Sequence, residues 1–240
     1  MAFSDIETNY GANIGLDDIV EEQRLFALKH HVSFGDFIQF AGAVGAANCN
    51  GGPQIAFFAG RPKATQAPRT FSRMADAGFS AVELVWLLVS HTVAAQERID
   101  TTLLNGTMVP RDGIKTGESP SPYPGEFRLQ SDFEVARDSR TACEWQNMIV
   151  NRTNMVSKFE LVMKKLSLVG QNESALTDCS DVIPVPQGYV RAPHLPAGKS
   201  LADIQASCSS TPFPNLSVDA GPVTTIAPVP TQGSASFGTF

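Results

Sequence analysis

Residues 80–95 read Ser-Ala-Val-Glu-Leu-Val-Trp-Leu-Leu-Val-Ser-His-Thr-Val-Ala-Ala. Ser80 followed three positions later by Glu83 is a capping box, which marks the start of a helix. The residues after it are apolar almost all round, which predicts a central helix, buried on most sides, that carries Trp86 and His91. Polar residues interrupt the stretch before it reaches the roughly 20 apolar residues of a membrane span, so we expect no contact with a membrane.

The rest of the chain also predicts a mainly helical protein without internal repeats. Residues 17–29 alternate apolar and charged positions at helical spacing, and a capping-box-like start at Ser33 and Asp36 precedes a helix over 37–47. A second capping box at Thr141 predicts one helix that runs to about Leu168 and is stopped by Gly170.

Between these helices the chain predicts long irregular loops. Residues 48–69 and 101–130 are rich in Gly, Pro, Ser or Asn, and only 126–129 reads as a short strand. The last thirty residues are Pro-rich and predict an extended tail, either draped over the surface or disordered. Together these patterns favour a mainly α fold with long loops.

Composition and charge exclude some classes of partner. The 240 residues are 42% hydrophobic and 18% charged, which is enough apolar material for one sizeable core or two lobes. The net charge of -6 and the pI near 5.2 give no basic field to attract a polyanion, so we expect no nucleic-acid partner.

The four cysteines favour disulfides over a metal site. Cys49, Cys143, Cys179 and Cys208 show no C-x-x-C spacing, which argues against zinc. Four Asn-x-Ser/Thr sequons would be glycosylated only in the secretory route, and chance occurrence is an equal alternative; they begin at Asn105, Asn151, Asn172 and Asn215. The start of the chain has neither a positive nor an apolar region, so we expect no signal peptide there.

His91 is the first candidate for chemistry, because haem proteins place an axial ligand on a histidine within an apolar helix. Taken alone, such a histidine is more often a hydrogen-bonded core residue.

The residues around His91 resemble a known protein family. Residues 83–95 closely resemble the proximal helix of the fungal class II haem peroxidases, the family of lignin, manganese and versatile peroxidases. Residues 128–132 (RLQSD) and 136–146 (ARDSRTACEWQ) are similar to another signature of that family. Further matches follow in order along nearly the whole chain, at residues 6–9, 12–16, 35–38, 177–184 and 194–198.

The resemblance implies a truncated plant/fungal-type haem peroxidase fold. It implies a peroxidase domain over 1–208 and a Pro-rich extended tail over 209–240. It also implies haem b, with His91 as the iron ligand and Asp132 accepting a hydrogen bond from the other ring nitrogen of His91. A carboxylate in that place fixes the tautomer of the imidazole and stabilises oxidised iron. A lone aspartate would otherwise be interpreted as a turn or capping residue.

Trp86 is the second candidate. It lies five residues before His91, about 140° round a helix, so it would point away from the haem. In the lignin and versatile peroxidases the tryptophan at this place is a surface electron-transfer site for bulky aromatics, and Glu83 and Glu144 match its acidic neighbours, which would stabilise a tryptophan radical cation. An ordinary core tryptophan is the alternative.

Two residues match metal ligands of the family. Glu97 falls where manganese-oxidising members place an aspartate, but one carboxylate does not make a manganese site. Thr92 matches one ligand of the proximal calcium ion. The loop that supplies the other ligands is missing, so we expect too few oxygens to hold calcium.

The resemblance also pairs Cys143 with Cys208, whereas the partners of Cys49 and Cys179 would precede Met1. The distal histidine and arginine that cleave peroxide would lie there as well, so we expect this chain to lack them. The predicted function is a secreted, monomeric, hydrogen-peroxide-dependent peroxidase for phenolic or lignin-type aromatics, with weak or no turnover in this chain. An inactive haem-binding or structural remnant is the alternative.

Overall fold

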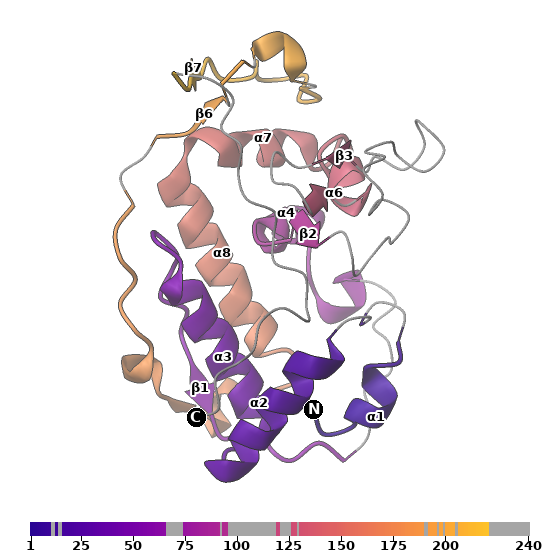
Figure 1. The fold of residues 1–240 in the computed structure, drawn as a ribbon, viewed down its shortest axis with the longest axis vertical. Helices are drawn as coiled ribbons and strands as arrows, with labels where there is room; N and C mark the ends of the chain where they lie inside the picture. Colours follow the sequence, from indigo (N-terminus) through magenta and orange to yellow (C-terminus); the bar gives the residue numbers. More distant parts are fainter. Residues whose placement is uncertain are drawn as a thin grey trace. The chain divides into compact units, whose positions relative to one another are not determined.

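The protein is described by a computed structural model, drawn as a ribbon in Figure 1. It describes residues 1–10, 13, 16–65, 74–91, 93–95, 119–120, 126–128, 130–189, 192–195, 197–198, 200–204 and 206–220. The chain divides into two compact units. Unit 1 comprises Met1–Leu87 and Asn151–Arg191, and unit 2 comprises Leu88–Val150 and Ala192–Phe240. The described parts are mainly helical, as the sequence predicts. The sequence predicts one short strand, over 126–129, and the structure has further short strands besides it.

Unit 1 is built largely of helices. Its α-helices are α1 (Ser4–Glu7), α2 (Asp17–Lys29), α3 (Phe34–Asn48), nearly all of α4 (Ala81–Leu88) and α8 (Arg152–Ser167). Short 3-10 turns lie at η2 (Met74–Ala77), η4 (Glu173–Ala175) and η5 (Ser180–Val182). Strand β1 (Phe58–Ala59) pairs antiparallel with β5 (Thr177–Asp178).

Unit 2 contains shorter elements. Strands β2 (Val93–Ala95), β4 (Glu126–Arg128) and β3 (Ser119–Pro120) form an antiparallel sheet in that order. Helices α6 (Gln130–Val135) and α7 (Ala142–Val150) follow β4 along the chain. Strand β6 (His194–Leu195) pairs in parallel with β7 (Ser217–Val218), and η6 (Leu201–Asp203) lies between them in sequence.

The first helices form where the sequence predicts them. Helix α2 has the predicted bounds, and α3 begins behind Ser33, whose hydroxyl accepts a hydrogen bond from the Asp36 N–H. Met1, Ala27 and Phe37 form a small buried cluster that joins the beginning of the chain to both helices. Burial of these apolar side chains stabilises the amino-terminal part of unit 1.

The predicted helix over residues 80–95 is wrong in its second half. Its capping box is present, because the Glu83 carboxylate accepts from the Ser80 N–H and the Ser80 hydroxyl from the Glu83 N–H. The helix nevertheless ends at Leu88, and a turn leads into β2 at Val93. Val89, Thr92 and Val93 are β-branched, and such residues favour strands over helices. Pairing of β2 with β4 then satisfies the backbone of residues 93–95.

The predicted helix from Thr141 to Leu168 is two helices. Helix α7 ends at Val150, and the Asn151 side chain accepts a hydrogen bond from the Asn154 N–H to start α8. Asparagine competes with the helical backbone in this way, so it caps a new helix better than it continues an old one. The predicted stop is confirmed, because α8 ends at Ser167 and Gly170 adopts a positive φ of 72°.

The start of the predicted tail is attached to unit 2. The Asp219 N–H donates to the Leu195 carbonyl, 2.9 Å away, and the Asp219 carboxylate lies 2.9 Å from Nε2 of His194. The extended tail over 209–240 stays a prediction, because residues 221–240 lie outside the described residues.

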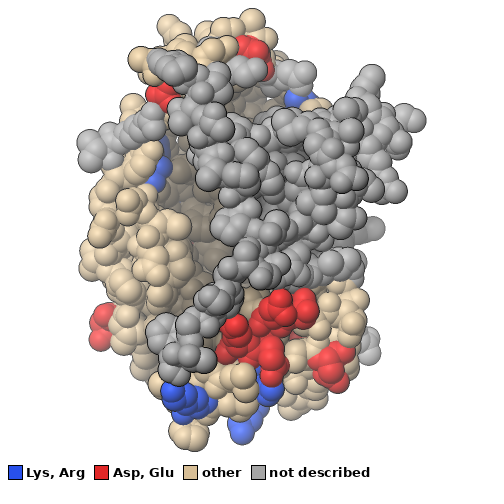
Figure 2. Space-filling view, in the orientation of Figure 1, with Lys and Arg blue, Asp and Glu red and all other residues tan. Residues whose placement is uncertain are grey.

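The surface is acidic around α1 and α2. Both helices begin with carboxylates, at Asp5 and Glu7 in α1 and at Asp17 and Asp18 in α2. Figure 2 shows acidic side chains gathered on the face where these helices lie. No helix among the described residues is long and apolar enough to cross a membrane.

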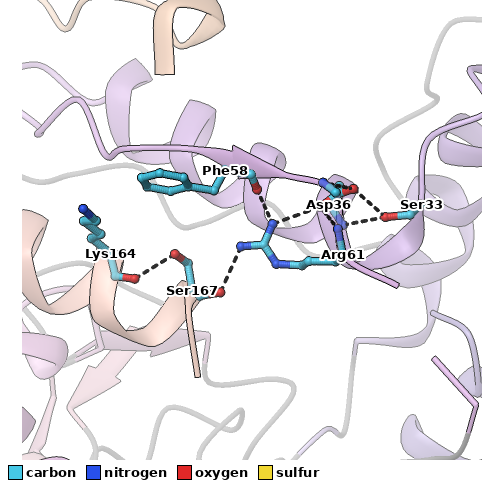
Figure 3. Close-up of polar contacts among 7 residues, drawn as sticks. Ser33, Asp36, Phe58, Arg61, Lys164 and Ser167 are labelled. Carbon is cyan, nitrogen blue, oxygen red and sulfur yellow. Dashed lines mark hydrogen bonds and ion pairs between the residues drawn. The ribbon is translucent and has the colours of Figure 1, made fainter. Parts of the chain in front are cut away.

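A buried ion pair ties three segments of unit 1 together (Figure 3). Asp36 in α3 and Arg61 after β1 are both buried, and their Oδ1 and Nη1 atoms lie 3.0 Å apart. Nη1 of Arg61 also donates to the Phe58 carbonyl, and Nη2 donates to the carbonyl of Ser167 at the end of α8, 2.9 Å away. The guanidinium thus joins the start of α3, the first residue of β1 and the end of α8.

The Asp36 carboxylate is well supplied with donors. Burial alone would raise the pKa of Asp36, but hydrogen bonds from the Gly60 N–H, the Ser33 hydroxyl and Arg61 outweigh it and hold that pKa below its usual value. A carboxylate whose pKa is lower in the folded state stabilises the fold above its unfolded pKa of about 3.9. That contribution is lost as the pH falls through the lower, folded-state pKa.

We expect Asp36→Asn to destabilise unit 1 by about 3 kcal/mol at pH 7, because it leaves the Arg61 charge buried without a counter-charge. The difference from the parent should shrink as the pH falls below about 4. Denaturant unfolding at pH 7 and pH 3 measures both values. Glu21→Gln, which breaks the exposed Arg24 pair, is the matched control and should have little effect. Equal losses from the two variants at pH 7 would contradict the prediction.

Candidate functional site

His91 lies in the turn between α4 and β2. Its N–H donates to the Leu88 carbonyl, 3.0 Å away, as the helix ends. The side chain is 52% exposed, so the ring is open on one side. Because α4 stops before His91, the helical spacing expected between Trp86 and His91 does not apply.

The sheet of unit 2 brings Asp132 to His91. Strand β2, directly after His91, pairs with β4 in the register Val93↔Arg128, and α6, which contains Asp132, begins two residues after β4. Nδ1 of His91 lies 3.0 Å from Oδ2 of Asp132. The two residues that the sequence singles out, 41 positions apart, are therefore in contact.

This contact fixes the state of the imidazole. An ionised carboxylate only accepts hydrogen bonds, so the proton of a neutral His91 belongs on Nδ1, and Nε2 carries the lone pair. Asp132 is the only hydrogen-bond partner of the His91 ring in the part of the chain that the structure describes. The ring thus offers one basic nitrogen on its exposed side.

Asp132 itself is 2% exposed, and its two oxygens differ. Oδ2 accepts from His91 and also from the Ser131 hydroxyl, 3.0 Å away, whereas Oδ1 is buried with no partner among the described residues. A buried, incompletely paired carboxylate is costly for stability, and such groups occur where function requires them.

The arrangement fits one kind of metal group better than others. Within the described ranges, no three His, Cys, Asp or Glu side chains gather as a cage for a metal ion. A single imidazole backed by a buried carboxylate would instead fit a haem iron, with His91 as the residue that holds it and Asp132 behind the imidazole. Thr92 and Glu97, the candidate calcium and manganese ligands, lie outside the described residues.

Comparison with known proteins decides the family. A model described as "Peroxidase" matches residues 3–112, and one described as "Fungal peroxidase extension region" matches residues 154–231. The chain is 49% identical to a versatile peroxidase of Pleurotus eryngii over 95% of its own length and 71% of that protein. It is 44% identical to ligninase C of Trametes versicolor (97% and 73%) and to a manganese peroxidase of Phlebia radiata (95% and 73%).

The chain belongs to the fungal class II peroxidases. Members of this family are haem enzymes, and by family this peroxidase is an oxidoreductase that acts on peroxide. The mainly helical fold agrees with that membership.

Among the described contacts, lysines of α8 lie at the ring of Trp86 and at the neighbouring Glu83 in this peroxidase. Trp86 is half-buried in α4, and Nζ of Lys158 lies 4.5 Å from its ring centroid. Glu83 is paired with Lys165 at 2.6 Å, and this ammonium, together with the Ser80 N–H, holds the pKa of Glu83 below its usual value. The Glu83 charge is therefore partly neutralised, and Lys158 places a cation over the ring. Glu144 belongs to the other unit.

The disulfide implied by the family resemblance is present. Cys143 at the start of α7 and Cys208 are joined, with their Cα atoms 4.6 Å apart. Cys49 and Cys179 are free thiols, the first exposed and the second half-buried. Gln146, also in α7, donates to the Thr211 carbonyl at 2.8 Å, which adds a second connection to the same segment.

Two contacts of the site have no clear signal in the sequence. Ser131 stands inside the quoted motif 128–132, but nothing in the motif indicates that its hydroxyl bonds to the neighbouring carboxylate. Lys158 is one of several lysines on α8, and only the fold brings it over Trp86.

We expect replacement of both Cys143 and Cys208 by Ser to destabilise unit 2 by about 4 kcal/mol, the loop-closure entropy of a crosslink across 65 positions. Thermal and denaturant unfolding of the oxidised protein measure the change. Replacing the free thiols Cys49 and Cys179 is the matched control and should cost far less. Similar losses in the two double variants would show that the crosslink contributes nothing specific.

Proposed function

We propose that this chain binds haem through Nε2 of His91 and serves in peroxide-dependent oxidation of aromatic compounds. The observation that carries the proposal is the 3.0 Å contact between Nδ1 of His91 and Oδ2 of buried Asp132. Membership of a haem enzyme family supports it.

Haem held by His91 would supply the redox chemistry, taking oxidising equivalents from peroxide and electrons from an organic substrate. The role of the protein begins with His91, whose basic Nε2 faces away from Asp132. Asp132 holds the Nδ1 proton and increases the electron density that the ring can donate. Because Asp132 is buried, water does not compete strongly for this proton.

The other histidines serve different ends. His30 and His31 close helix α2, and Nδ1 and Nε2 of His194 face the Ala192 carbonyl and the Asp219 carboxylate. We assign none of them to proton transfer on peroxide, a step that typically contributes 10²–10⁴-fold to a rate. We therefore expect the 240-residue chain on its own to bind haem and to turn over weakly or not at all. Haem binding with no turnover would select the alternative, an inactive haem-binding remnant.

We expect His91→Gly to lose haem incorporation, seen as loss of the Soret band, because His91 is the only potential iron ligand beside Asp132 among the described residues. Added imidazole should restore the band by occupying the space of the lost ring. His31→Asn is the matched control, because Asn tolerates the positive φ of 56° at that position and leaves Asp132 untouched. A His91→Gly variant that takes up haem like the parent would overturn the ligand assignment.

Trp86 is the proposed oxidation site for bulky aromatics. Its ring is half-buried, so one part can meet solvent while the rest packs in unit 1. The relatives include proteins named ligninases and a versatile peroxidase, which supports lignin-type aromatics as the substrate class. The Lys158 ammonium over the ring opposes positive charge on it, so Lys158 makes Trp86 harder to oxidise.

We expect Lys158→Gln to raise several-fold the weak rate at which the haem-loaded chain oxidises a bulky aromatic dye. A unit charge at 4.5 Å raises the energy of a radical cation by about 1 kcal/mol even with the dielectric of water. Lys158→Arg, which keeps the charge, is the control and should leave the rate nearly unchanged. In a Trp86→Phe background the effect of Lys158→Gln should vanish. If the rate still rises there, the charge acts on another group.

A further inference from the structure

The two oxygens of Asp132 differ in how many hydrogen bonds they accept. Oδ2 accepts from both Nδ1 of His91 and the hydroxyl of Ser131, each at 3.0 Å. Oδ1 is buried and has no hydrogen-bond partner in the part of the chain that the structure describes. A carboxylate can accept one donor on each oxygen. In Asp132 both donors bond to the same oxygen, so each hydrogen bond affects the strength of the other.

The two donors compete for the same negative charge. Each hydrogen bond to Oδ2 withdraws electron density from it, which makes it a weaker acceptor for the other donor. Ser131 therefore weakens the hold of Asp132 on the His91 proton. Solvent screens this competition only weakly at the carboxylate, because Asp132 is 2% exposed and charges interact more strongly inside a protein than in water.

We propose that Ser131 is a positioning residue that limits how strongly Asp132 polarises His91 and, through it, a bound iron. The second half of this inference rests on the proposed haem ligation by His91. With the Ser131 hydroxyl present, the ring donates less electron density to iron, and oxidised iron is stabilised less. A less stabilised oxidised state is a stronger oxidant.

The position of Ser131 suits this role. It directly precedes Asp132 in the first turn of α6, so its place relative to the carboxylate is set by the helix. The residue itself is exposed, and its hydroxyl is small, so removing it disturbs little packing. The side chain can thus be changed without removing either partner of the His91–Asp132 contact.

The first test needs no haem. In the chain with ¹⁵N-labelled histidine, the Nδ1–H resonance of His91 is identified by its absence in His91→Gln. Ser131→Ala should move this proton downfield, because the remaining hydrogen bond to Asp132 becomes stronger. Ser131→Thr retains the hydroxyl and should keep the parent position, and the Nδ1–H of His194, which faces the Ala192 carbonyl, should not move in either variant.

The second test uses the haem-loaded protein. Ser131→Ala should lower the midpoint potential of the iron, whereas Asp132→Asn should raise it, and Ser131→Thr should match the parent. A merely structural role for Ser131 predicts the opposite sign for Ser131→Ala, because a displaced carboxylate would hold the His91 proton less well.

An unmoved or upfield proton in Ser131→Ala, or a raised potential, would overturn the proposal. If the parent takes up no haem, the proposed function fails, and the resonance of the haem-free chain still decides whether Ser131 weakens the His91–Asp132 contact.

Discussion

The hydrogen bond between Nδ1 of His91 and Oδ2 of Asp132 is the interaction on which the functional interpretation depends. It selects one tautomer, leaves one basic nitrogen on an open side, and keeps a charged group inside unit 2 that would otherwise be unfavourable. The pairing of β2 with β4 places the two residues together, because its register brings the chain after His91 to the chain before Asp132. The same strand pairing therefore forms the sheet and assembles the site.

The sequence predicts which residues form this site, His91 and Asp132, better than it predicts the secondary structure around them. The motif around His91 identifies the residue, yet the apolar run suggests a long helix where the structure has a helix, a turn and a strand. An apolar run gives no period by which a buried helix and a buried strand can be told apart, and the β-branched residues after Leu88 decide the outcome. In 17–29, where charged and apolar residues alternate, the predicted and observed bounds agree.

Contacts that depend on tertiary structure are not predictable in this way. The Asp36–Arg61 pair joins segments far apart in the chain, and the lysine over Trp86 comes from α8. Both result from packing in unit 1, and neither leaves a pattern in local sequence. Around Trp86 the motif names the acid Glu83, and only the fold shows that Glu83 is paired with Lys165 and that Lys158 lies over the ring.

The crosslink between Cys143 and Cys208 also determines how the chain responds to cleavage. All of α8 and the rest of the second segment of unit 1 lie between the two bridged cysteines. If a protease cuts the backbone once anywhere from residue 144 to residue 207, the disulfide still holds the two fragments together, and the mass rises only by one water molecule. The fragments separate only when the disulfide is reduced. Migration of the oxidised protein as a single species in a gel therefore does not show that its backbone is uncut.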